Sequence, residues 1–310
     1  MSHVVALTRC AARIPWARIP SAGALATTAL SEWLYGEYFI GWRPSAPRLE
    51  YSGSPWYVAE LTARCAGPTT FERGFRVTQR TRGGAFVESG GISLWVPHVA
   101  ALRPVNARAG AEVAVELPCA REGAIPGFFT IVSRAGRLDP GAPHLKFYVN
   151  ATPTGALDLV GALLELRTAR FEAKVTNDPA HFGRRDTLLV YAAPGSAARI
   201  ARLLTAFARR PRALRDETPP MTVPLARGVS VAESPGHHAE SFGSHRCRLV
   251  AEGLLTARGE GRPSLTAVAE RFEREGLDWA APWFGALPRR WLDRLTSMPT
   301  PAPRKGHPHV

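Results

Sequence analysis

The stretch HLKFYVNATPTGALDLVGALLELRTARFEAKVTN, residues 144–177, decides the fold. Its two ends alternate apolar and polar residues, which is typical of strands, and its middle repeats apolar residues at the helical period. DTLLVYAA (186–193) then predicts another strand, and SAARIARLLTAFARR (196–210) predicts a helix that Pro211 stops. We therefore expect an α+β fold in which an antiparallel sheet is flanked by helices.

The pattern differs on either side of this core. Upstream, ALATTALSEWLYGEYFIGW (24–42) and AELTARCAG (59–67) predict helices, and the glycine pairs in FRVTQRTRGGAFVESGGISLWVP (75–97) predict hairpins. AEVAVELP (111–118) and GFFTIVSRAG (127–136) continue as strands, and 244–258 and 264–276 predict later helices. We divide the chain into a smaller N-terminal α/β section (1–110), an α+β domain (111–295) and a disordered tail (296–310).

The composition limits the partners. The net charge of +13 favours anionic partners, although an arginine-rich coding style would give the same charge without any partner. No stretch interleaves basic and aromatic residues as nucleic-acid modules do, and no apolar run reaches the length of a membrane span. We expect neither nucleic acid nor a membrane as partner. The four cysteines form no CxxC pair and no metal-ligand spacing occurs, which favours reduced thiols in a cytoplasmic protein without a metal.

The lysines are unusual. Only three of the 39 basic residues are lysines, and two of them, Lys146 and Lys174, lie inside the predicted strands, whereas Lys305 lies in the tail. Alternate strand residues share a face, so Lys146 lies with Tyr148 and Lys174 with Glu172. If both strands belong to one sheet, the two amines can share a face and lower each other's pKa. A lysine tuned in this way can act as a general base, which an arginine cannot. The alternative is two solvated lysines placed by chance.

Two segments supply groups that suit a phosphate. HFGRRDTLLVY (181–191) carries His181, Arg184 and Arg185 before a strand that ends in Tyr191. SFGSHRCRL (241–249) carries His245, Arg246 and Arg248 at a predicted helix start, where backbone N–H groups attract anions. The set favours chemistry on a phosphorylated substrate.

At these residues the sequence resembles a known family. KFYVNA (146–151), FEAKVTND (171–178), RRDTLLVYAA (184–193), SFGSHRCRLVAEG (241–253) and LSEWLYGEYFIGW (30–42) resemble the HopA-type type III effectors. That family includes homologues in class V lanthipeptide and thioamitide biosynthesis. More distantly, residues 145–250 resemble the phosphothreonine lyases of bacterial pathogens.

The resemblance implies a phosphoserine/phosphothreonine lyase that forms dehydroalanine or dehydrobutyrine in a precursor peptide. It implies that Lys174 is the base, that Lys146 stabilises the enolate, and that Arg246 and Tyr191 lie near the phosphate. A further phosphate arginine of the lyases falls by spacing at His181, with Arg184 and Arg185 just beyond. No cofactor is implied. The partners implied are the phosphorylated precursor peptide and a kinase-like protein encoded nearby.

One position departs from the lyase pattern. Where the lyases have a histidine as general acid, two residues after the first lysine, this chain has Tyr148. His245, His144 or His181 are candidates to replace that acid, or phosphate leaves with arginine neutralisation alone. The departure keeps open a noncatalytic HopA-type effector or peptide-binding protein as the alternative, with an RNA-binding protein as a third class. The N-terminal section is a candidate surface for a precursor's leader peptide.

Overall fold

The computed structural model describes residues 2–21, 23–42, 53–139, 141–234, 240–285, 287 and 289–296. The predicted tail therefore lies outside the described residues, apart from Thr296. Within the described residues the chain forms two antiparallel sheets and several helices, so the predicted α+β class is confirmed. No helix in those ranges combines the length and the apolar character needed to cross a membrane.

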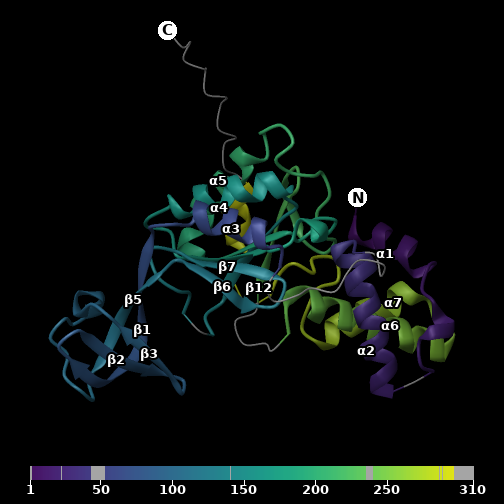
Figure 1. Cartoon of the computed structure of the whole chain (residues 1–310). Helices are drawn as coiled ribbons and strands as arrows, with labels where there is room; N and C mark the ends of the chain where they lie inside the picture. The colour runs from purple at the N-terminus through teal and green to yellow at the C-terminus, as the bar shows by residue number, and fades with distance from the viewer. Residues whose placement is uncertain are drawn as a thin grey trace, which may run out of the picture.

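A seven-stranded antiparallel sheet forms the centre of the molecule (Figure 1). Its strand order is β11-β12-β8-β10-β9-β7-β6. The strands are β6 (Ala120–Ile125), β7 (Phe128–Val132), β8 (His144–Val149), β9 (Phe171–Thr176), β10 (Leu188–Ala192), β11 (Val223–Ala226) and β12 (Val229–Ser234). The strands β8 and β9, which carry the two lysines, are separated by β10.

One face of this sheet is a helix-covered core. Alternate residues such as Phe147 and Val149 of β8, or Phe171 and Ala173 of β9, are buried there. They pack with residues of α3 (Pro55–Arg64), α4 (Pro153–Leu164) and α5 (Pro194–Phe207), near α8 (Arg290–Thr296). The side chains predicted to face the core, away from the lysines, do so.

The opposite face is only partly covered. Tyr148 of β8, Leu189 of β10 and Ala232 of β12 join a second core with the N- and C-terminal helices. Those elements are α1 (His3–Ala11), η1 (Trp16–Arg18), α2 (Gly23–Leu34), the π-helix η2 (Tyr35–Ile40), α6 (Phe242–Glu260) and α7 (Ser264–Arg274). They cover the β12–β8–β10 side of the face and leave the β9–β7 side for another neighbour.

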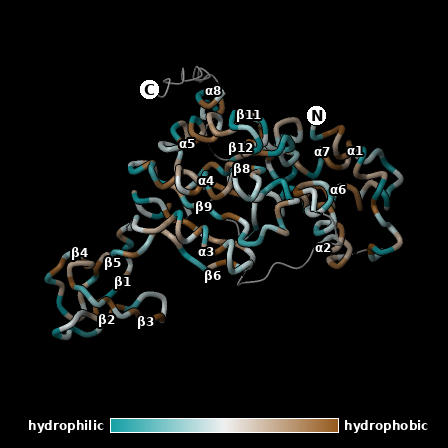
Figure 2. The backbone as a smooth tube through the Cα atoms, turned by 45° about the horizontal axis from the view of Figure 1, so that its top comes forward, coloured by the Kyte–Doolittle hydropathy of each residue, from teal (hydrophilic) through white to brown (hydrophobic). Residues whose placement is uncertain are grey.

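That neighbour is a five-stranded sheet of order β3-β2-β1-β5-β4, which forms a separate lobe in Figure 1. Its strands are β1 (Thr69–Thr81), β2 (Gly84–Ser89), β3 (Ile92–Val96), β4 (Leu102–Arg103) and β5 (Glu112–Pro118), with the short η3 (Val99–Ala101). Figure 2 shows hydrophobic and hydrophilic residues interspersed along these strands, and the buried apolar ones form a third small core. The chain passes from this sheet to the large one at residues 118–119; the division into functional domains near residue 110 stays a prediction.

Candidate active site

The strand register brings both lysines to one face of the large sheet. On the central strand β10, Tyr191 lies opposite Lys146 of β8 and Glu172 of β9, and Leu189 lies opposite Tyr148 and Lys174. Residues directly opposite each other in an antiparallel pair project to the same side. The two amines therefore share a face across one intervening strand, at the border between the helix-covered and open parts of that face.

Lys146 is enclosed. Its side chain is 3% exposed, and its Nζ lies 4.9 Å from the centroid of the Tyr148 ring and 5.3 Å from that of Tyr191. It donates no hydrogen bond to any other described residue. Burial, with the charge of Lys174 adding to it, lowers the pKa of Lys146 to about 7, although Asp186 opposes this shift. Near neutral pH this amine therefore exists both with and without its proton.

Lys174 has access to solvent. It is half-buried, its Nζ lies 4.5 Å from the centroid of the Phe128 ring, and it lines a cleft between the two sheets. Burial lowers the pKa of Lys174 as well, against the opposing charge of Asp186. Lys174 is thus the amine that a molecule in the cleft can reach.

A buried ion pair lies beside the lysines. Arg184 and Asp186 are 4% and 1% exposed, and Arg184 donates Nε to Oδ1 at 2.7 Å and Nη2 to Oδ2 at 2.9 Å. Burial alone would raise the pKa of Asp186, but Arg184 and then the two lysines hold it below its usual value. Asp186 is therefore an ionised carboxylate in the field of both amines. Sequence reasoning singled out the arginines of this segment and missed Asp186.

The cleft has a volume of about 1710 Å³ and lies between the open part of the large sheet and strands β1, β4 and β5 of the small one. His144, Glu172, Lys174 and Tyr191 line its large-sheet wall. The ring centroids of His144 and Tyr191 are 5.5 Å apart, and burial lowers the pKa of His144. His144 thus contacts the cleft near the lysines.

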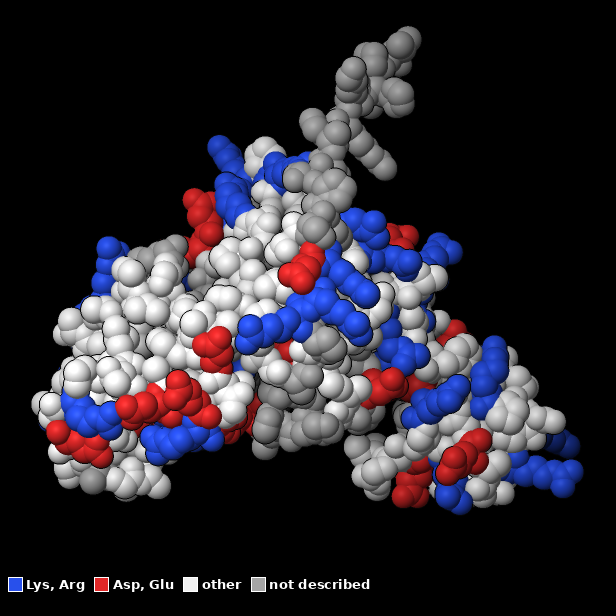
Figure 3. Space-filling view, turned by 180° about the vertical axis from the view of Figure 1, so that it is seen from behind, with Lys and Arg blue, Asp and Glu red and all other residues white. Residues whose placement is uncertain are grey.

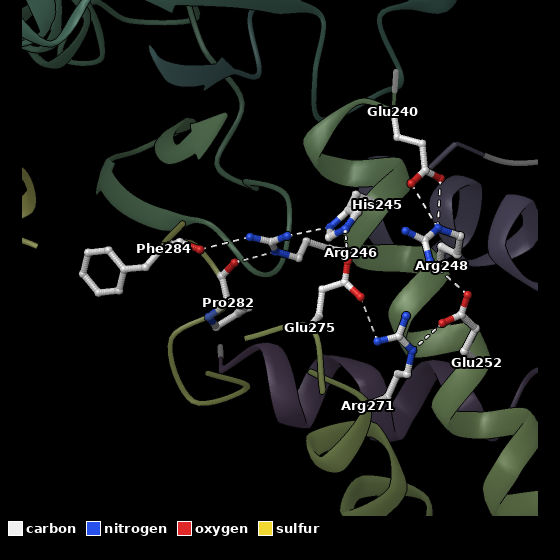
Figure 4. A network of polar contacts seen from close by, with 9 residues as sticks. All are labelled: Glu240, His245, Arg246, Arg248, Glu252, Arg271, Glu275, Pro282 and Phe284. Atoms are coloured by element: carbon white, nitrogen blue, oxygen red, sulfur yellow. Dashed lines mark hydrogen bonds and ion pairs between the residues drawn. The ribbon is translucent and has the colours of Figure 1, made fainter. Parts of the chain in front are cut away.

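Arg246 and His245 belong to a network on the covered side (Figure 4). Arg246, 2% exposed, donates Nε to the Pro282 carbonyl at 2.8 Å, Nη2 to the Phe284 carbonyl at 3.0 Å, and Nη1 to His245 Nδ1 at 2.6 Å. Since a guanidinium only donates, His245 Nδ1 is the acceptor, and its Nε2 faces Glu275 at 3.4 Å. Burial lowers the pKa of both His245 and Arg246, the latter to about 10.

Tyr148 connects this network to the lysine face. Its side chain is 1% exposed, and its hydroxyl has no hydrogen-bond partner among the described residues. Burial raises the pKa of the Tyr148 phenol, while the charge of Arg246 acts in the opposite direction. The phenol therefore keeps its proton at ordinary pH.

The remaining predicted residues point elsewhere. Arg185 donates Nε to Glu217 at 2.8 Å and Nη1 to the Tyr38 carbonyl at 2.9 Å. Arg248 binds Glu240 and Glu252 in the outer part of the network in Figure 4. His181 is buried in η4 (Pro179–His181), between β9 and β10. The structure thus brings together Lys146, Lys174, Tyr148, Tyr191 and Arg184, with Arg246 and His245 bordering Tyr148; it directs Arg185 and Arg248 away.

Comparisons with known proteins identify a family for the segment that forms the seven-stranded sheet. Residues 119–284, which hold the whole seven-stranded sheet and both lysines, match the model of the HopA1 effector protein family. No curated protein matches the chain. Among solved structures, an effector protein from Pseudomonas syringae pv. syringae strain 61 is similar at 15% identity and a TM-score of 0.50, over 92% of this chain and 98% of that one. Another, from Pseudomonas syringae pv. tomato strain DC3000, has 18% identity and a TM-score of 0.48, over 82% and 89%. Because the family match spans more than half of its length, the chain belongs to the HopA1 effector protein family.

Proposed function

We propose that this protein is a lyase that removes phosphate from phosphoserine or phosphothreonine in a peptide. The observation that carries the proposal is the pair of amines on one sheet face, one enclosed with a pKa of about 7 and the other open to a large cleft. Elimination needs a base for a weakly acidic Cα–H and a positive charge for the enolate that follows. Two lysines with lowered pKa values can supply both.

The two roles follow from access. Lys174 lines the cleft, so we assign it as the base that takes the Cα proton, although burial lowers the pKa of both amines. Lys146, enclosed on the same face next to the Tyr148 and Tyr191 rings, acts in its charged form on the carbonyl oxygen that becomes the enolate. The electron pair of the Cα–H bond then forms the Cα=Cβ double bond, the Cβ–O bond breaks, and phosphate leaves with that bond's electrons.

Phosphate binding is proposed for cations near the lysines. Arg184 lies beside Lys174, since its guanidinium carbon is 5.6 Å from the centroid of the same Phe128 ring. Arg246 has donated three of its five N–H groups to other described residues, which leaves two for an oxyanion. Tyr148, Tyr191 and His144 are the candidate proton donors to the leaving phosphate. We do not assign this step to His245, because its Nδ1 accepts from Arg246.

The substrate must be phosphorylated before it reaches this site. We therefore propose a precursor peptide as substrate and a kinase-like protein that acts before the lyase, in a lanthipeptide-like pathway in the cytoplasm. The charge distribution is compatible with an anionic peptide, since Lys and Arg side chains are spread over the main body and the small lobe (Figure 3).

The second candidate is a noncatalytic peptide-binding effector. The observation that favours it is Tyr148, because a buried phenol with a raised pKa is a weak acid for the leaving phosphate. General acid catalysis contributes about 10²–10⁴-fold, so its loss would slow turnover by that factor and leave peptide binding as the dominant property.

Mass spectrometry of phosphoserine and phosphothreonine peptides separates the two candidates. A lyase releases one phosphate per peptide and leaves a dehydroamino acid, whereas a binding protein captures the peptide with no change in mass. We expect Lys174→Ala to lower turnover by about 10²–10⁴-fold and to stop exchange of the Cα hydrogen with deuterium in the solvent. Arg82→Ala, in the exposed turn between β1 and β2, is the control. Equal turnover by Lys174→Ala would overturn the assignment of the base.

A further inference from the structure

The cleft is larger than its proposed chemistry requires. Pockets for small ligands measure about 300–1,000 Å³, whereas this cleft measures about 1710 Å³. A single phosphorylated residue at Lys174 would occupy only part of it. The remaining space adjoins the small sheet, so a molecule that fills the cleft contacts both sheets.

The small-sheet wall contains cations that no acid neutralises. Among the described residues, six cationic side chains line the cleft, against four acidic ones. Of the six, Arg121, Arg137 and Arg170 form ion pairs with acidic residues that also line the cleft. Arg73 and Arg103 have no acidic partner among the described residues, and both are exposed. The excess positive charge of the cleft is therefore on Arg73 and Arg103, together with Lys174 on the opposite wall.

The same wall offers apolar contact. Phe71 is 36% exposed, and Ile125 of β6 across the cleft is 39% exposed. The guanidinium carbon of Arg103 lies 4.4 Å from the centroid of the Phe71 ring, and its Nη1 donates to the carbonyls of Ala100 and Leu102. Arg103 is thus held in place, so little rotamer entropy is lost when it meets an anion.

We propose that the cleft, with Phe71, Arg73 and Arg103 on its small-sheet wall and Ile125 on the opposite wall, binds an extended acidic segment of the peptide whose phosphorylated residue lies at Lys174. The inference rests on the proposed function. It commits to a peptide because the wall combines two unpaired arginines with apolar side chains and is continuous with the lysine site. A nucleic acid would instead need a longer basic track with several stacking aromatic side chains.

The test uses two peptides that share one phosphothreonine. The short one ends a few residues either side of it, and the long one adds an Asp- and Glu-rich segment. Arg73→Glu, Arg103→Glu and the double variant are compared with Arg82→Glu, which makes the same charge change on an exposed turn. Fluorescence anisotropy gives affinity and phosphate release gives turnover. Arg73→Glu is the safeguard against misfolding, because Arg73 is exposed and forms no hydrogen bond, ion pair or ring contact with another described residue.

We expect the double variant to bind the long peptide roughly tenfold more weakly, which is the scale of two exposed ion pairs. Its KM for the long peptide should rise while kcat, and turnover of the short peptide, stay unchanged. Unchanged affinity for the long peptide, or an equal loss for both peptides, would overturn the inference. Tighter binding of an RNA oligomer that is lost in the same variant would also overturn it.

The affinity measurement in this experiment does not depend on catalysis. If the wild-type protein releases no phosphate, the proposed function fails, yet anisotropy with an unphosphorylated long peptide still reports on the arginine wall. Binding that depends on Arg73 and Arg103 in that case would retain the peptide surface without the lyase.

Discussion

A comparison of two buried cations explains why this arginine-rich chain keeps lysine on its central sheet. Lys146 and Arg246 are 3% and 2% exposed. Burial lowers both pKa values, but that of Arg246 stays at about 10, whereas that of Lys146 reaches about 7. Only the amine can therefore lose its proton in the ordinary pH range. Arginine at position 146 would keep the charge and remove the titration.

The titration of Lys146 has a measurable effect on stability. The pKa of Lys146 is about 7 in the folded protein, against about 10.4 for a lysine in an unfolded chain. Between these values the unfolded chain holds a proton that the folded protein has released, so the contribution of Lys146 to the free energy of unfolding rises with pH. The loss of stability that comes from burying the charged amine is fully present below pH 7 and disappears near pH 10.

Methionine at this position keeps the length of the side chain without a charge. At each pH, the free energy of unfolding of Lys146→Met is compared with that of the wild type. We expect the variant's advantage to be about 3–5 kcal/mol larger at pH 7 than at pH 10. Urea denaturation of both proteins at the two pH values measures this. Lys174→Met, at a site only half-buried, should show a smaller change. A difference between the proteins that is independent of pH would contradict the lowered pKa.

At the residue level, the sequence correctly predicted on which face of a strand a side chain lies, but not which residues that side chain contacts. The two-residue period of a strand correctly placed both lysines opposite the core. The same rule could not reveal Asp186, because its importance depends on β10 lying between β8 and β9. Nor could it separate the adjacent Arg184 and Arg185, one of which pairs with Asp186 while the other reaches the end of η2.

At the scale of elements, prediction failed where buried polar groups are satisfied by distant segments. VSVAES forms β12 and is buried throughout, yet half of it is polar. Ser230 accepts from Thr222 at 2.8 Å, and the Glu233 carboxylate accepts from the backbone of Gly285 and Leu287. No local sequence pattern predicts such partners. By contrast, the end of the helical segment at Gly41 was predictable from the sequence. The backbone φ of Gly41 is +67°, a value that favours glycine.

The contact between α6 and α7 gives a matched test within one helix. A Cβ on Gly253 would lie 2.6 Å from Val268 Cα, whereas a Cβ on Gly259 would meet no atom of the described residues within 4 Å. Gly253→Ala must push the two backbones apart, so it should destabilise the protein by about 1–3 kcal/mol. Gly259→Ala only gains helix propensity, so it should stabilise by up to about 1 kcal/mol. Thermal unfolding of both variants decides this, and equal shifts in Tm would disprove the close packing.

At the scale of the molecule, the five-stranded sheet lies outside the segment that matches the HopA1 family. The family match begins at residue 119, directly after β5, and the small sheet has a hydrophobic core of its own. The chain enters and leaves the lobe at adjacent points. Thr69 pairs with Pro118, and Cys119 donates its backbone N–H to the Pro68 carbonyl at 3.0 Å. A short turn could therefore replace everything between them.

Removal of the lobe would separate the proposed catalysis from the proposed peptide capture. We expect a chain in which Asn-Gly replaces residues 70–117 to fold, because a two-residue turn suits a hairpin of paired strands. It loses the ion pair of Glu72 with Arg121, 2.5 Å apart, at a cost of roughly 1 kcal/mol. Turnover of the short phosphopeptide should persist, since every lysine-face residue remains, whereas affinity for the long acidic peptide should fall. Failure of this shortened chain to unfold cooperatively would show that the lobe is part of the HopA1 core, and undiminished affinity would place the peptide elsewhere.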